Sequence, residues 1–201
     1  MIKSFQLPFH FDPQKLKAEL ARIEPGAWID HFNQSIYEGN WSGVALRSVA
    51  GKPMSLYPDP TATGSFADTE ILSRCPYYQS VLATFRCPLT SVRLLRLQAG
   101  SSIRPHRDYR LGYEDGEVRL HIPVITNPAV AFFLDGERVP MAEGQCWYVN
   151  VNLTHWVENQ STIDRIHLVI DCVVDDWLAA YFGAVTPQAD AASAAKPAHI
   201  G

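Results

Sequence analysis

The sequence predicts an all-β core with flanking helices, arranged as a double-stranded β-helix, or jelly roll. Short segments rich in Val, Ile, Leu and aromatic residues recur from about residue 91 onward, without helical patterns between them. Turn signals such as Asp135-Gly136 and Gly144 separate these segments. The predicted strands are Val92–Leu97, Val118–Ile125, Val130–Leu134, Gln145–Asn150 and Arg165–Val174. Two layers of four such strands would form the jelly roll, with helices packed outside one sheet.

Three helices are predicted around this core. The first begins at Pro13, because Asp12 is a favourable N-cap and proline fits the first helical position. Its apolar stripe consists of Leu16, Leu20 and Ile23. A second helix is expected from about Pro76 and a third over Asp175–Phe182. Between the first two helices, residues 41–65 are expected to form short extended pieces broken by Gly, Pro and Thr.

The composition indicates one domain in a reducing compartment. The 201 residues are 47% hydrophobic, which suffices for a core with an enclosed site. We expect residues 1–183 to form this domain and residues 184–201 to be an Ala- and Pro-rich tail. The formal net charge of -4 and the lack of a Lys or Arg block argue against nucleic acid or membrane partners. The absence of a secretory apolar region predicts a cytoplasmic location, and four cysteines without a C-x-x-C pair are expected to be free thiols.

The strongest chemical signal is the segment Pro105-His106-Arg107-Asp108. On an extended segment, His106 and Asp108 point to the same face because side chains alternate with a period of two. His155, which follows a predicted strand and a polar turn, is the best third ligand. Two histidines and one carboxylate form the facial triad of non-haem Fe(II) oxygenases, which leaves positions for a bidentate co-substrate and O2. The alternative is a surface loop with a capping aspartate, whereas a kinase H-R-D loop lacks its D-F-G and Gly-rich partners here.

A second signal is Arg165, which opens a strand that otherwise reads as buried. A buried guanidinium without a partner is costly, and an anionic ligand would offset that cost. The distal carboxylate of 2-oxoglutarate is such a ligand. The alternative is a salt bridge to a nearby carboxylate, such as Asp164 or Asp171.

Further cationic and polar side chains interrupt the other predicted strands. Arg119 and His121 share one face of their strand, and a polar face inside a jelly roll predicts a site for an anion. Arg93 and Arg96 lie on opposite faces of another strand, so at most one of them points inward. We expect the substrate to carry a carboxylate held by these arginines. The candidate substrate-binding residues are Arg93, Arg96, Tyr109, Trp156 and His167.

Together these motifs resemble the aspartyl/asparaginyl β-hydroxylase family of Fe(II)/2-oxoglutarate dioxygenases, and the core is also similar to bacterial cis-proline hydroxylases. The resemblance covers roughly Trp41 to Trp177. Its most specific parts are I-R-P-H-R-D-Y at Ile103–Tyr109, V-R-L-H-I-P at Val118–Pro123 and H-W-V-E-N-Q-S-T-I-D-R at His155–Arg165. One departure is Asp108, because the animal aspartyl hydroxylases have glycine there and bind iron through two histidines.

The resemblance implies a cupin-like fold and a metal centre of Fe(II) held by His106 and His155, with 2-oxoglutarate and O2 as co-substrates. It implies that Arg165 binds the C5 carboxylate of 2-oxoglutarate, and that Arg119 and His121 lie beside its C1 end or the substrate. The implied reaction hydroxylates an unactivated C–H bond of an amino acid or of an Asp or Asn residue in a peptide, releasing succinate and CO2. The rival hypothesis is a cupin-like metal-binding protein or metalloenzyme that does not use 2-oxoglutarate.

Overall fold

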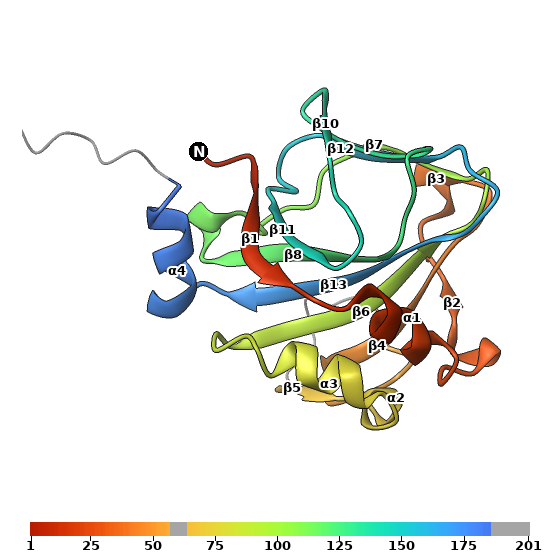
Figure 1. Ribbon diagram of the computed structural model, residues 1–201, viewed down its shortest axis with the longest axis horizontal. Coiled ribbons are helices and arrows are strands. Elements are labelled where there is room, and N and C mark those ends of the chain that lie inside the picture. The colour runs from red at the N-terminus through yellow and green to blue at the C-terminus, as the bar shows by residue number, and fades with distance from the viewer. Residues whose placement is uncertain (57–63, 186–201) are drawn as a thin grey trace, which may run out of the picture.

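The computed structural model describes residues 1–56 and 64–185, and it contains two antiparallel sheets that face each other (Figure 1). The larger sheet has eight strands. In spatial order they are β1 (Ser4–His10), β11 (Gln145–Val149), β8 (Glu117–Ile125), β13 (Arg165–Val173), β6 (Leu89–Leu97), β4 (Trp41–Val49) and β2 (Ile29–Asp30), with β5 (Phe66–Asp68) paired to β4. The smaller sheet consists of β10 (Glu137–Val139), β9 (Val130–Leu134), β12 (His155–Asn159), β7 (Ser102–His106) and β3 (Tyr37–Glu38). This arrangement confirms the predicted double-stranded β-helix.

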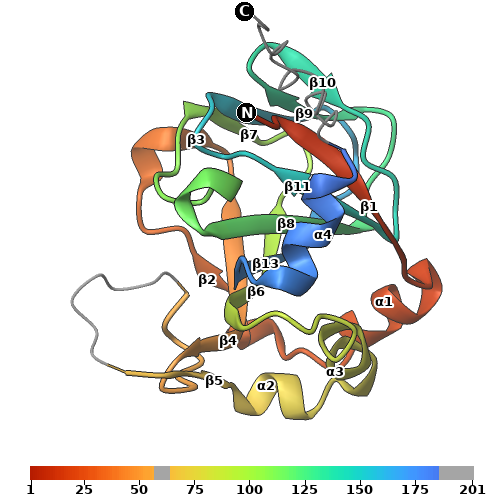
Figure 2. The same cartoon turned by 90° about the vertical axis from the view of Figure 1, so that its left-hand side faces the viewer.

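The helices cover the outer face of the larger sheet, as predicted (Figures 1 and 2). They are α1 (Pro13–Leu20), α2 (Glu70–Ser73), α3 (Pro76–Leu82) and α4 (Asp176–Gly183). The carboxylate of Asp12 accepts hydrogen bonds from the first backbone amides of α1, which confirms this residue as the N-cap. The described residues also form three short 3-10 helices: η1 (Pro25–Ala27), η2 (Gln34–Ile36) and η3 (Tyr113–Asp115). No helix within residues 1–56 and 64–185 is both long and apolar enough to span a membrane.

Alternation along the central strands divides the interior into two parts. In β13, the even-numbered residues Ile166, Leu168 and Ile170 pack into the core beneath the helices. The odd-numbered residues of the same strand face the smaller sheet, and they include Arg165, His167 and Asp171, all of which are buried. Because β8, β13 and β6 are neighbours, their inward-facing polar side chains gather in one region between the sheets.

Some elements differ from those that the sequence predicts. The first helix ends at Leu20, so Ile23 lies beyond it. Residues 41–49 form one continuous nine-residue strand rather than several short pieces. The strands β7 and β12 were not predicted, since their polar residues hide the apolar alternation on which strand prediction depends. Residues 57–63 of the 41–65 segment lie outside the described part of the chain, and so do residues 186–201 of the C-terminal tail. The four cysteines are free and buried, as expected.

Candidate metal centre

The structure brings His106, Asp108 and His155 together between the two sheets. One potential ligand atom from each residue lies within 4.8 Å of the others. His106, at the end of β7, pairs directly with His155, at the start of β12. Asp108 lies just beyond β7, where its backbone amide donates to the carbonyl of Val151 at 2.9 Å. The sheet register and this loop contact therefore produce the convergence that the His-x-Asp spacing predicts.

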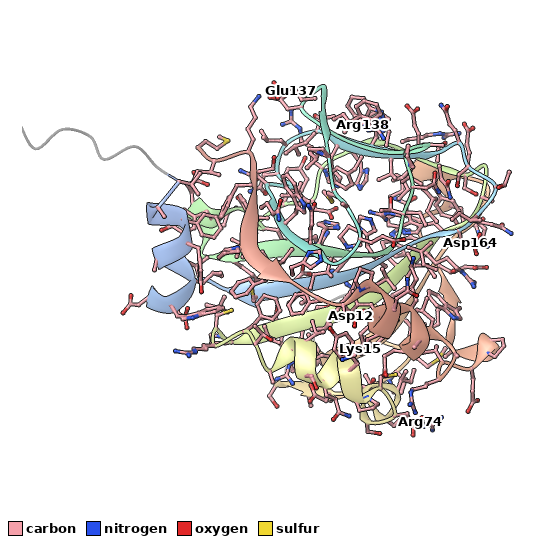
Figure 3. All side chains as sticks on the ribbon, in the orientation of Figure 1. Asp12, Lys15, Arg74, Glu137, Arg138 and Asp164 are labelled. Carbon is pink, nitrogen blue, oxygen red and sulfur yellow. The ribbon has the colours of Figure 1, made fainter. Side chains whose placement is uncertain are left out.

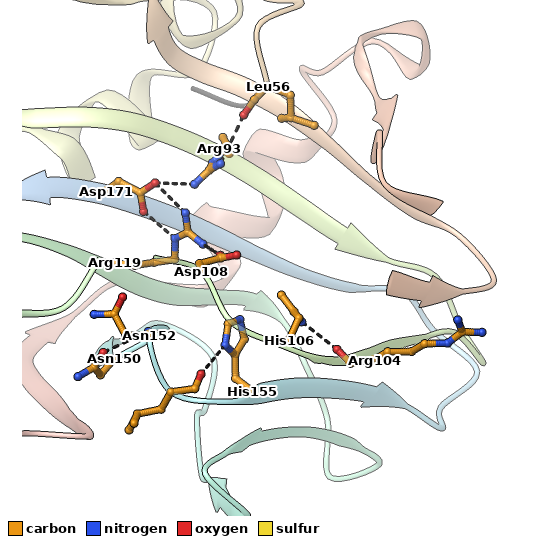
Figure 4. A network of polar contacts seen from close by, with 11 residues as sticks. Leu56, Arg93, Arg104, His106, Asp108, Arg119, Asn150, Asn152, His155 and Asp171 are labelled. Atoms are coloured by element: carbon orange, nitrogen blue, oxygen red, sulfur yellow. Dashed lines mark hydrogen bonds and ion pairs between the residues drawn. The ribbon is translucent and has the colours of Figure 1, made fainter. Parts of the chain in front are cut away.

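The hydrogen bonds of the two histidines leave the same ring atom of each available. His106 Nδ1 lies 2.8 Å from the carbonyl oxygen of Arg104, and His155 Nδ1 lies 3.1 Å from that of Leu153 (Figure 4). A carbonyl oxygen only accepts, so each Nδ1 donates and each Nε2 carries a lone pair. Burial, together with the neighbouring His106, lowers the pKa of His155 to about 4, which keeps it neutral near pH 7. Two imidazoles and a carboxylate are a donor set that suits Fe(II).

Asp108 belongs to a chain of alternating charges (Figure 4). Arg119 Nη1 donates to Asp108 Oδ2, while Nε and Nη2 of the same guanidinium donate to the two oxygens of Asp171 at 2.7 and 2.9 Å. Arg93 Nη2 donates to Asp171 Oδ2 at 2.6 Å. Burial alone would raise the pKa of Asp108, but Arg119 and the two histidines outweigh it and lower that pKa. Asp108 is therefore ionised near neutral pH, as a metal ligand must be.

Arg165 lies in the same cavity without a carboxylate partner. Its side chain is only 2% exposed, and Nη2 donates to His167 Nδ1 at 2.8 Å. Among the described residues no carboxylate lies within 4.0 Å of its guanidinium, and Nε has no hydrogen-bond partner. Burial accordingly lowers the pKa of Arg165 to about 9. This is the state expected of a guanidinium built to bind an anion.

Neither Asp164 nor Asp171 forms a salt bridge with Arg165, so the salt-bridge alternative is wrong for both. Asp164 lies at the periphery of the molecule (Figure 3), where its Oδ1 accepts from the backbone amide of Ala99 at 3.1 Å. Asp171 pairs with Arg119 and Arg93 instead. The strand register explains this choice, because Asp171 lies directly opposite Arg119 across the β13–β8 pair.

A cavity of about 420 Å³ joins these groups. Residues of both sheets line it, and they include the three candidate ligands, Arg93, Arg119, His121 and Arg165. Arg119 and His121 therefore face inward, as their shared strand face predicts. His121 is fully enclosed near Arg165, whereas Arg119 lies against Asp108. The cavity volume falls in the ordinary range for small-molecule sites.

Of the five candidate substrate-binding residues, Arg93 and Tyr109 line the cavity and the other three do not. Arg93 is buried at the cavity, and Tyr109 lines its mouth with a side chain that is 79% exposed. His167 is buried behind Arg165, which it contacts. As alternation requires, only one of Arg93 and Arg96 faces the cavity, and it is Arg93; the expectation that Trp156 lies at the cavity is wrong. Arg96 lies on the opposite strand face, over the ring of Trp28, and Trp156 stacks on Phe133, away from its neighbour His155.

Three residues in or near the cavity are not predicted as site residues from the sequence: Asp171, His31 and Trp41. The sequence suggests Asp171 only as a partner for Arg165, although its spacing from Arg165 places it on the same strand face. His31 and Trp41 line the cavity as a stacked pair with ring centroids 3.8 Å apart. Burial lowers the pKa of His31 to about 4, so this wall of the cavity is uncharged near neutral pH. No sequence pattern distinguishes His31, because it lies in an irregular connection.

Comparisons of the sequence with known proteins find one matching family model and a distant relative. The family model described as aspartyl/asparaginyl beta-hydroxylase matches residues 11–174. L-proline cis-4-hydroxylase of Rhizobium meliloti (strain 1021) is 26% identical over 163 residues, covering 80% of this chain. The match covers 57% of that relative, so the chain spans a little more than half of the relative's length.

Two solved structures support the fold. A prolyl-4-hydroxylase of Pseudomonas putida has a TM-score of 0.53 and 15% identity, with 86% of this chain and 92% of that chain covered. HygX of Streptomyces hygroscopicus, solved with nickel and 2-oxoglutarate bound, has a TM-score of 0.53 and 13% identity, with 86% of this chain and 83% of that chain covered.

Proposed function

The chain belongs to the aspartyl/asparaginyl beta-hydroxylase family, and on this premise we propose that it is an Fe(II)- and 2-oxoglutarate-dependent dioxygenase. The observation that carries the proposal is the buried guanidinium of Arg165, without a carboxylate partner among the described residues, in the cavity that holds the triad. A cupin-like protein that does not use 2-oxoglutarate would have no need for this unneutralised charge. The dicarboxylate supplies one anionic group for the metal and one for the arginine.

In the proposed site, His106, Asp108 and His155 hold the iron. Bound iron, with 2-oxoglutarate and O2, supplies the oxidative chemistry that hydroxylates an unactivated C–H bond and releases succinate and CO2. Arg165 binds the C5 carboxylate of 2-oxoglutarate, and His167 holds the guanidinium in place through its Nδ1. His121, whose Nδ1 lies 3.4 Å from Nδ1 of His167, is proposed to lie beside the bound 2-oxoglutarate or the substrate. The largely buried walls restrict water around the reacting groups.

For the substrate, we propose an amino acid or an Asp or Asn residue in a peptide. The name of the Rhizobium meliloti relative supports the first possibility, because that protein acts on L-proline. Arg93 is the best candidate to bind a substrate carboxylate, since it lines the cavity and Arg96 does not. Tyr109 at the mouth is in a position to contact the rest of the substrate. We further propose that residues 1–183 act as one catalytic domain.

An anaerobic titration tests the proposal directly. Fe(II) added to the metal-free protein with 2-oxoglutarate should produce a visible metal-to-ligand charge-transfer band, and O2 should then yield succinate. Metal binding without this band, and without succinate release, would favour the cupin-like alternative. Succinate release measured across a panel of amino acids and short peptides would then identify the substrate class.

A further inference from the structure

Asp171 on β13 is a buried carboxylate to which the proposed reaction assigns no role. It is 2% exposed and lies opposite Arg119 in the strand register. Both of its oxygens accept hydrogen bonds from Arg119, and Oδ2 also accepts one from Arg93 on the other neighbouring strand. A carboxylate held by two guanidiniums from the strands on either side is fixed in both position and orientation.

Arg119 connects this fixed carboxylate to the candidate metal centre. Two of its nitrogens are engaged by Asp171, and the third, Nη1, donates to Oδ2 of Asp108. No hydrogen bond from the described residues reaches the other oxygen of Asp108, Oδ1. The guanidinium thus occupies one oxygen of the candidate ligand and leaves the second oxygen available.

A guanidinium beside a cation site can weaken metal binding in two ways. Its positive charge repels a divalent metal, and its planar fork can bind both oxygens of a carboxylate. Asp171 reduces the repulsion by neutralising Arg119. It also prevents the guanidinium from binding both oxygens of Asp108, because it holds the Nε and Nη2 edge of the fork and only Nη1 reaches Asp108.

We propose that Asp171 is a positioning residue for the metal centre, which neutralises and orients Arg119 so that Asp108 keeps one oxygen for the metal. The inference rests on the proposed function, because it requires the triad to bind a divalent metal. It goes beyond that function by placing a metal-affinity determinant on β13, outside the ligand set. Outer partners of metal ligands typically change affinity about 10- to 100-fold when they are removed.

The test is a Co(II) titration of the metal-free protein, followed by visible absorption, with thermal unfolding as the measure of folding. Asp171→Asn is expected to weaken Co(II) binding about 10- to 100-fold. Glu143→Gln is the matched control, because Glu143 also bridges two donors, Lys17 Nζ at 2.7 Å and the backbone amide of Thr126 at 3.2 Å, away from the cavity. Equal losses in the two variants, or wild-type affinity in folded Asp171→Asn, would overturn the inference.

A second comparison separates positioning from a purely structural role. If Asp171 acts through Arg119, adding Asp171→Asn to Arg119→Gln should change the Co(II) affinity by less than about twofold. A further tenfold loss in this background would contradict the proposal. The double variant can still be measured if Asp171→Asn alone fails to fold. It removes the charge of Arg119 together with that of Asp171, so it leaves one fewer buried cation unpaired than the single variant does. Wild-type protein that binds no Co(II) would instead refute the proposed function itself.

Discussion

Replacing Arg165 by methionine should have opposite effects on stability and on co-substrate binding. Burial lowers the pKa of Arg165 to about 9, well below that of an exposed guanidinium. Since one pH unit of pKa corresponds to about 1.4 kcal/mol, burying the charged form costs roughly 4–5 kcal/mol. Arg165→Met removes this cost and loses one hydrogen bond to His167, which is worth about 1 kcal/mol. We therefore expect the ligand-free variant to unfold at a temperature no lower than that of the wild type.

The same substitution should greatly weaken 2-oxoglutarate binding. Removing one partner of a buried, hydrogen-bonded charge pair costs about 2–5 kcal/mol. At about 1.4 kcal/mol per factor of ten, the Michaelis constant for 2-oxoglutarate should rise roughly 30- to 4000-fold. Arg165→Lys should also be impaired, because an ammonium group cannot reproduce the planar fork of the guanidinium.

Two assays check this reasoning. Succinate release at varied 2-oxoglutarate concentration gives the Michaelis constant, and thermal unfolding with and without 2-oxoglutarate gives the stabilisation by the ligand. Wild-type protein should be stabilised by 2-oxoglutarate and Arg165→Met should not. Unchanged 2-oxoglutarate kinetics in both the Met and Lys variants, or a large loss of stability in ligand-free Arg165→Met, would refute the assignment and make Arg165 a structural residue.

Three further predictions follow from the charged groups of the cavity. Asp108→Ala should weaken Fe(II) binding and succinate release strongly although both histidines remain, and wild-type iron binding would exclude Asp108 as a ligand. Arg93→Gln should raise the Michaelis constant of a carboxylate substrate at least about tenfold but not that of its carboxamide, whereas Arg96→Gln, on the outer strand face, should change neither. Burial alone would raise the pKa of Asp171, but Arg119 and Arg93 outweigh it and lower that pKa. The unfolded state therefore takes up this proton first as the pH falls, so urea denaturation should show stability lost below about pH 4, and less of it lost in Asp171→Asn.

The alternation of side chains along each strand predicts much of the fold and several of the residues that line the cavity. Arg165, Arg119 and His121 stand out in the sequence because each interrupts an apolar strand, and all three prove to line the cavity. The same rule excludes Trp156, whose side chain must point away from that of its neighbour His155. Because His155 and Trp156 are adjacent on one strand, they cannot both point into the cavity. Trp156 therefore points away from it and stacks on Phe133.

Other features depend on which strands become neighbours, and the sequence does not state this. The parity of Asp171 predicts that it shares a face with Arg165, yet its partners are Arg119 and Arg93. This choice follows from the position of β13 between β8 and β6, and from the register that sets Asp171 opposite Arg119. The inward direction of Arg93, rather than Arg96, likewise depends on which face of β6 meets the smaller sheet.

The network around Asp171 also changes the electrostatic argument about the substrate. The sequence suggests an excess of guanidinium groups in the cavity, which a second anion would neutralise. Among the buried or part-buried arginines that line the cavity, Arg93 and Arg119 already share the carboxylates of Asp171 and Asp108, and Arg165 has no anionic partner within the described residues. Iron and 2-oxoglutarate bring equal and opposite charges, so the buried groups of the loaded cavity keep about one positive charge. That balance suits a substrate that presents a single carboxylate better than a free acidic amino acid, which brings two, and it makes the acid-against-amide comparison at Arg93 the sharper test of the substrate class.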